Sequence, residues 1–330
     1  MKMKTVSIII PCRNEEDTIC SVLQAVYGQQ YQRDLLEVII ADGLSTDNTL
    51  EKIEQFKQDH TDLTIRVISN QKTQIPAALN LAIKSAKNEV ILRMDAHSIP
   101  REDYIALCVR DLEAGKGDNV GGRWEIIPRI DSWMARGISR AAAHPLGAGN
   151  ARYRTSGEEG PVDTVPFGCY QRVLFERIGL FDETLLTNED YELNERIRRS
   201  GGVVWFDPEI VCRYYSQPTL KGLTQQYWRY GFWKARMARK YPASLKLRQL
   251  MPPLFVIGLL FLLFLSLFQP IFLTGFVSVF LLYLSIIIGA SFPVAIRQNE
   301  FALICSVPLA ILTMHVTWGA GFMAGLLINR

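Results

Sequence analysis

Charge is distributed unevenly along this chain of 330 residues, and that limits the folds it can adopt. Up to residue 209 acidic and basic side chains are mixed, but residues 210–299 contain no aspartate or glutamate. Lysine and arginine crowd the first part of this acid-free stretch, and long uncharged runs follow. A basic segment beside apolar segments is typical of the junction between a soluble domain and a membrane anchor. We therefore expect one soluble part and one membrane-associated part.

Three uncharged apolar runs follow the basic stretch, at residues 254–268, 271–296 and 301–328. A helix needs about 20 apolar residues to cross a bilayer, so the second and third runs are long enough. The first run is short, which leaves a re-entrant segment open as an alternative to a full span. We expect three spans, with the basic residues beside them in the cytoplasm and Arg330 outside. A packing role is expected for His315 in the third run.

The N-terminal apolar run, residues 6–10, ends at Pro11 and is too short for the core of a signal peptide. The soluble part is therefore expected in the cytoplasm, held at the cell (inner) membrane by a multi-pass anchor. We divide the chain into a soluble α/β domain at residues 1–218, a basic interfacial segment at 219–250 and a transmembrane region at 251–330.

The soluble part alternates short apolar runs with amphipathic segments. Strands are predicted at residues 6–10, 37–41, 63–68, 89–93 and 120–127, and helices at residues 19–26, 46–56, 76–86, 130–143 and 188–199. This alternation predicts a Rossmann-like, mostly parallel sheet with flanking helices. Residues 144–168 are rich in glycine, proline and serine, and we expect an irregular loop that covers an acceptor.

Polar residues follow three of the predicted strands. They are Pro11, Arg13 and Glu15 after the first strand, Asp42 after the second, and Asp95 and His97 after the fourth. Ligands of parallel sheets bind outside the carboxyl ends of the strands, so these residues are expected to converge on one crevice. The chain has no G-x-G-x-x-G after the first strand and no G-x-x-x-x-G-K-[ST], so carboxylates and a metal would hold the nucleotide.

Asp95 and His97 stand two residues apart, just after an apolar run. Side chains at this spacing in an extended segment point the same way, so a carboxylate and an imidazole can bind one divalent ion. We interpret the pair as a metal site that grips a diphosphate. The alternative is that Asp95 caps a turn and His97 is an ordinary loop residue. Asp42 has a similar alternative, because Asp-Gly favours turns.

Several motifs resemble those of family 2 glycosyltransferases with the GT-A fold. They are V-S-I-I-I-P-C-R-N-E-E at 6–16, A-D-G-L-S-T-D-N-T at 41–49, M-D-A-H at 94–97, G-C-Y-Q-R at 168–172, G-L-F-D-E at 179–183 and N-E-D-Y-E-L-N-E-R at 188–196. The resemblance covers about residues 5–240 and is nearest to bacterial exopolysaccharide glucosyltransferases of the succinoglycan type.

The resemblance implies a role for each residue at the strand ends. Glu15 and Asp42 would hold uridine, within a nucleotide-binding set of Pro11, Arg13, Glu15, Asp42 and Asp95. The D-x-D triplet of the family, which holds ribose and the metal–diphosphate, is Asp95-Ala96-His97 here. Histidine is a softer ligand than carboxylate, so we predict that Mn²⁺ is accepted at least as well as Mg²⁺.

Glu189 and Asp190 open the predicted helix at residues 188–199. In the family, the aspartate of this pair is the catalytic base, so the resemblance assigns that role to Asp190 and places Glu189 near the diphosphate and acceptor. The structural alternative is a cap, because carboxylates in a first turn complement the helix dipole. The dipole also predicts a lowered pKa, which would keep Asp190 ionised.

The segment at residues 219–241 is a basic amphipathic helix with interleaved aromatic residues. Such a helix fits the interface of an anionic membrane, and the apolar runs that follow favour lipid over nucleic acid. Gln226, Arg229 and Tyr230 are similar to the family's Q-x-x-R-W element, in which arginine steadies the leaving diphosphate and tryptophan touches the acceptor. Tyr230 replaces the tryptophan. The alternative for Arg229 is a lipid-facing cation.

The resemblance implies an inverting, metal-dependent enzyme of exopolysaccharide or cell-envelope glycan synthesis. It would move a hexose from a UDP-sugar to a hydroxyl of a lipid-linked (polyprenyl) saccharide, with Mn²⁺ or Mg²⁺ as cofactor. Two alternatives stay open. One is a polyprenyl-phosphate glycosyltransferase, whose acceptor is a phosphate. The other is a non-catalytic nucleotide-sugar-binding scaffold of a polysaccharide export complex.

Overall fold

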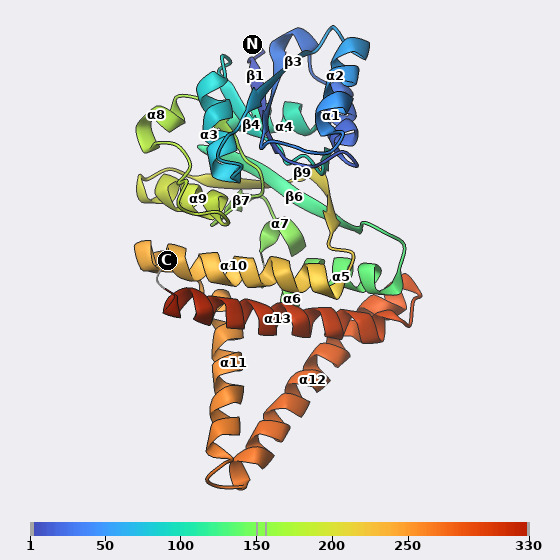
Figure 1. Ribbon diagram of the computed structural model, residues 1–330, viewed down its shortest axis with the longest axis vertical. Coiled ribbons are helices and arrows are strands. Elements are labelled where there is room, and N and C mark those ends of the chain that lie inside the picture. Colours follow the sequence, from blue (N-terminus) through green and yellow to red (C-terminus); the bar gives the residue numbers. More distant parts are fainter. Residues whose placement is uncertain (1–2, 150, 156, 329–330) are drawn as a thin grey trace. The chain divides into compact units, whose positions relative to one another are not determined.

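A computed structural model describes residues 3–149, 151–155 and 157–328 (Figure 1). The chain divides into two compact units. The first comprises Met1–Glu125 and Ser156–Tyr214, and the second comprises Ile126–Thr155 and Tyr215–Arg330. This division differs from the one expected from the sequence, because residues 126–155 belong with the C-terminal part and residues 219–250 form no unit of their own.

Four parallel strands build the half of the sheet that carries the predicted site residues. In sheet order they are β3 (Thr64–Ser69), β2 (Leu36–Asp42), β1 (Val6–Cys12) and β4 (Val90–Arg93). In the register of these strands, Cys12 pairs with Asp42 and Ile9 with Arg93. Their runs of buried, mostly branched aliphatic residues favour central strands. The predicted strands are confirmed here, with small shifts at their ends.

The rest of the sheet contains antiparallel pairs. Its strands are β8 (Cys169–Gln171), β6 (Asn119–Pro128), β9 (Val204–Ser216), β5 (Ser98–Pro100) and β7 (Gly160–Pro161). β8 is antiparallel to β4 and β6, and β9 is antiparallel to β5 and β7. The sheet is therefore mixed, and the expected parallel order holds only for β1–β4. The prediction misses β9, which contains Pro208 and Glu209, two residues that disfavour strands.

Helices flank this sheet. They are α1 (Ile19–Tyr27), α2 (Thr49–Asp59), α3 (Ile75–Ser85), α4 (Tyr104–Glu113), α8 (Leu174–Ile178) and α9 (Glu189–Arg199). Ile8 and Ile10 of β1 share a core with Val22 and Leu23 of α1, and none of the four is exposed. Burial of each such side chain contributes about 1.5–3 kcal/mol. This packing fixes the strand ends that carry the site.

The second unit is helical. It contains α5 (Trp133–Ala143), α6 (Pro145–Ala148), α7 (Arg152–Thr155), α10 (Leu220–Lys240), α11 (Leu247–Leu265), α12 (Ile271–Gln298) and α13 (Leu303–Leu327). α10 and α13 lie side by side, and α11 and α12 form a hairpin (Figure 1). The segment expected to be an irregular loop at 144–168 contains α6, α7 and β7 instead. Helices α11, α12 and α13 are each long and apolar enough to cross a membrane.

Candidate active site

The carboxyl ends of β1, β2 and β4 meet at one edge of the sheet, and Asp42 is the last residue of β2. Asp42 is buried, and its two carboxylate oxygens accept hydrogen bonds from the Ser45 hydroxyl at 2.6 Å and the Ser45 backbone N–H at 3.1 Å. Asp42 therefore stabilises the turn that follows it, which agrees with the alternative that Asp42 is a turn residue. Arg13 lies at the same edge, where its Cβ would be 3.3 Å from a Cβ on Gly43.

Glu15 and His97 come together although 82 residues separate them in sequence. The His97 Nδ1 atom lies 3.1 Å from Glu15 Oε1, and the second Glu15 oxygen accepts a hydrogen bond from the Thr18 hydroxyl at 2.6 Å. A carboxylate that contacts one ring nitrogen of a histidine fixes the orientation of the ring. Glu15 therefore positions His97. The sequence predicts both residues in one crevice but does not predict this direct contact.

Arg93 joins the Asp95 stretch to the beginning of α9. Its Nη2 atom lies 3.2 Å from Asp95 Oδ1 and 2.9 Å from Glu189 Oε1, and its side chain is only 7% exposed. Burial alone would lower the pKa of Arg93, but the surrounding carboxylates outweigh it and raise the pKa, so Arg93 stays a cation. Sequence reasoning missed this residue. The available signal is a lone arginine at the end of a buried strand, two positions before Asp95.

Asp190 lies in the first turn of α9, and its Oδ1 atom accepts a hydrogen bond from the backbone N–H of Tyr191 at 2.7 Å. Its side chain is half-buried beside a fully enclosed neighbour, Glu189. Burial raises the pKa of Asp190, against the opposing effect of Arg93. The expectation that the helix dipole lowers this pKa is therefore wrong, because removal from water dominates. Burial likewise raises the pKa of Glu189, to about 7, with the charge of Asp190 adding to it.

The side chains at the strand ends can hold a metal ion only if the substrate supplies the remaining ligands. Among residues 3–149, 151–155 and 157–328, no group of three or more histidine, cysteine or acidic side chains is arranged to hold a metal ion. Asp95 and His97 give one carboxylate and one imidazole, with Glu15 on the imidazole. They lie in a turn, in which the Ser98 N–H donates to the Asp95 carbonyl oxygen at 3.0 Å, and not in the extended segment expected from the sequence. Divalent ions at phosphate-transfer sites are commonly held by one or two protein side chains plus substrate phosphates. The residues present fit such a shared site.

The residues matched to the Q-x-x-R-W element lie on α10 in the second unit. Gln226 Nε2 donates a hydrogen bond to the Tyr230 hydroxyl at 3.0 Å, one helical turn away. Gln226 and Arg229 line a cavity of about 480 Å³ together with Gln217 and Trp228. Amide, indole and guanidinium groups are suited to sugar hydroxyls and phosphate.

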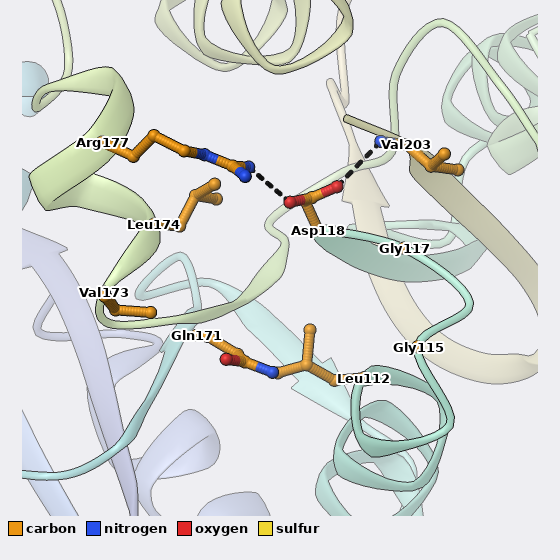
Figure 2. A pocket seen from close by; sticks show the side chains of 9 residues that line it. All are labelled: Leu112, Gly115, Gly117, Asp118, Gln171, Val173, Leu174, Arg177 and Val203. Atoms are coloured by element: carbon orange, nitrogen blue, oxygen red, sulfur yellow. Dashed lines mark hydrogen bonds and ion pairs between the residues drawn. The ribbon is translucent and has the colours of Figure 1, made fainter. Parts of the chain in front are cut away.

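A separate cavity of about 370 Å³ lies in the first unit, lined by residues from the end of α4, by α8 and by β8 (Figure 2). Gln171 in its wall pairs with Val90, the first residue of β4, so this cavity is at the opposite end of β4 from Asp95. Asp118 accepts hydrogen bonds there from Arg177 at 2.5 Å and from the Val203 N–H at 3.0 Å. None of the predicted site residues lines it.

Acidic residues at the carboxyl ends of β2 and β4, followed by an E-D pair opening α9, define a GT-A-type glycosyltransferase domain. The chain belongs to glycosyl transferase family 2, whose family model matches residues 7–179. The resemblance seen in the sequence is thereby confirmed.

Similar proteins extend this assignment over nearly the whole chain. It is 28% identical, over 98% of both chains, to the dolichyl N-acetyl-alpha-D-glucosaminyl phosphate 3-beta-D-2,3-diacetamido-2,3-dideoxy-beta-D-glucuronosyltransferase of Methanococcus voltae. It is 28% identical, over 98% of this chain and 95% of the relative, to the succinoglycan biosynthesis protein ExoA of Rhizobium meliloti (strain 1021). The mannosyltransferase PcManGT from Pyrobaculum calidifontis, solved with GDP-Man and Mn²⁺, has the same fold, with a TM-score of 0.65 and 21% identity over 99% of this chain and 88% of that one.

Proposed function

We propose that this glycosyltransferase moves a hexose from a UDP-sugar to a hydroxyl group of a lipid-linked saccharide, with inversion at the anomeric carbon. The observation that carries the proposal is one connected cluster in the first unit. Arg93 contacts both Asp95, the first residue of the D-A-H triplet, and Glu189, the first residue of the E-D pair. Arg93 therefore connects the triplet suited to hold a metal and diphosphate with the pair that contains Asp190, the group suited to accept a proton.

Each residue of the cluster has a distinct task in this proposal. The acceptor hydroxyl attacks the anomeric carbon, its proton passes to Asp190, and the bond to the UDP oxygen breaks. A base with a raised pKa holds that proton more firmly, so the shift at Asp190 suits its role. Asp95 and His97 would hold the divalent ion, which supplies positive charge to the departing diphosphate. The nucleotide would lie against Pro11, Arg13, Glu15 and Asp42, at the carboxyl ends of β1 and β2 in the same unit.

The relatives support the choice of acceptor. The protein from M. voltae is named for a dolichyl phosphate-linked sugar acceptor, and the protein from R. meliloti for succinoglycan biosynthesis. A lipid-linked acceptor also gives a reason for the apolar helices in the second unit, because the enzyme would meet its substrate at the membrane.

The experiment is a transfer assay with the full chain in detergent or nanodiscs. A panel of UDP-sugars and GDP-mannose is offered with a membrane lipid extract or with polyprenyl phosphate, and released nucleotide and product anomer are measured. Asp190→Asn should lower transfer to the lipid extract at least about 100-fold, the usual contribution of a general base, while UDP binding changes little. Asp34→Asn, a change at an exposed carboxylate, is the matched control and should leave turnover unchanged.

The outcomes separate the alternatives. Transfer by Asp190→Asn to polyprenyl phosphate at the wild-type rate would favour the phosphate-acceptor enzyme, because a phosphate is already ionised and needs no base. UDP binding with no release of nucleotide under any acceptor would favour the scaffold.

A further inference from the structure

We propose that α13 lies along the membrane surface together with α10, and that only the α11–α12 hairpin enters the bilayer. The C-terminal end of the chain then stays on the same side of the membrane as α10. This arrangement takes the place of the three spans that hydropathy alone favours. It rests on the membrane association of the second unit and not on the proposed reaction.

The first argument is the close, parallel packing of α10 and α13. A Cβ added at Gly321 would lie 2.4 Å from the Trp228 carbonyl oxygen, and one added at Gly325 would lie 2.4 Å from the Phe232 carbonyl oxygen. One turn along α13 therefore matches one turn along α10, in the same direction. Backbones in such contact hold the two helices at a common orientation, so both cross the membrane or neither does.

The second argument is the charge on α10. This helix carries six cations and no acidic residue, namely Lys221, Arg229, Lys234, Arg236, Arg239 and Lys240. Charged side chains in the hydrocarbon core are costly and rare, and six distributed over one helix are typical of a helix that lies at the interface. If α10 lies at the interface, its parallel neighbour α13 lies there too.

The third argument is that both ends of α13 are bonded to arginines of other helices in the same unit. Just before its N-terminus, Glu300 pairs with Arg136 of α5 at 2.7 Å. Just beyond its C-terminus, the Ile328 carbonyl accepts a hydrogen bond from Arg236 of α10 at 3.1 Å. Between them, His315 Nε2 lies 2.8 Å from the Leu146 carbonyl oxygen of α6. The ends of a spanning helix would lie on opposite sides of about 30 Å of hydrocarbon.

Burial explains why α13 is nonetheless apolar. In its most apolar stretch, 44% of residues are buried, compared with 11% for α11 and 6% for α12. Ile311 and Met314 share a core with Leu223 and Tyr227 of α10. Many apolar residues of α13 thus serve protein packing, whereas most of those of α11 and α12 remain exposed and fit lipid.

The test places a reporter at the C-terminus of the full chain in a bacterial inner membrane. Green fluorescent protein fluoresces only in the cytoplasm, and alkaline phosphatase is active only outside it. We expect a fluorescent fusion and an inactive phosphatase, with the basic ends of the hairpin inside. As a control, one 20-residue apolar helix inserted before each reporter should reverse both signals. A dark fusion with active phosphatase, and reversal of that pattern by the control, would overturn the proposal whether or not the protein transfers sugar.

Discussion

Arg93 and Glu189 form an ion pair of 2.9 Å in which each side chain is only 7% exposed. The pair connects the end of β4 to the beginning of α9, and therefore the D-A-H triplet to the E-D pair. A charge placed this deeply is stable only with its partners, because removing one partner leaves the other without compensation. The geometry of the candidate site and the stability of the first unit thus depend on the same contact.

Above about pH 7, where Glu189 is ionised, Arg93→Met should destabilise the protein by about 3–5 kcal/mol, the usual effect of breaking a buried ion pair. Urea unfolding of the detergent-solubilised full chain, followed by tryptophan fluorescence, measures this. The matched control is Arg33→Met, which removes an exposed pair with Asp62 and should cost less than about 1 kcal/mol. Equal effects of the two substitutions would contradict the structural role given to Arg93.

Glu189 should make stability fall as the pH rises from about 4.5 to about 7. Burial raises its pKa to about 7 from an ordinary value of 4.5, so the folded protein keeps a proton that the unfolded chain has lost over this range. The loss is at most about 3 kcal/mol. Thermal unfolding of Glu189→Gln should lack this part of the slope. Glu102→Gln, at an exposed site, should keep the wild-type slope, and two identical profiles would count against the shift.

His97→Asp should shift the metal preference of transfer towards Mg²⁺. It replaces an imidazole with a carboxylate and restores the D-x-D pattern, and Mg²⁺ prefers oxygen ligands. After chelation with EDTA, the wild type should recover at least as much activity with Mn²⁺ as with Mg²⁺. The ratio of Mg²⁺ to Mn²⁺ activity should rise several-fold in the variant. An unchanged ratio would remove His97 from the metal site.

Gly325→Leu should destabilise the second unit by about 1–3 kcal/mol, the cost of overfilling a packed contact, because its side chain would meet the backbone of Phe232. The matched control is Gly289→Leu on α12, where a Cβ would meet nothing within 4 Å. Thermal denaturation in detergent compares the two. If Gly325→Leu proved as stable as the control, the packing of α13 on α10 would be wrong.

Local pattern predicted the strands β1 to β4 and most of the helices that flank them, because uninterrupted branched aliphatic runs and helical spacing are local signals. It also identified which residues follow the strand ends. The rule for strand ends placed Glu15 and His97 in the same crevice, but it could not find the direct contact between their side chains, because that contact depends on the tertiary positions of two loops 82 residues apart. The prediction of a lowered pKa for Asp190 was wrong for a related reason. The helix dipole is visible in the sequence, but the burial that outweighs it belongs to the tertiary structure.

Hydropathy alone could not predict the surroundings of α13 either. A helix buried against protein and a helix exposed to lipid can have the same composition. Only the neighbours distinguish them: the close approach of Gly321 and Gly325 to α10 is visible in the tertiary structure and not in the hydropathy.

The pairing of Ile9 with Arg93 has a consequence for how this fold can vary. Side chains alternate between the two faces of a strand, so inserting or deleting one residue within β4 would turn Arg93 to the opposite face. The guanidinium would then leave both Asp95 and Glu189. A change of one residue inside this strand would therefore dismantle the centre of the site in a single step.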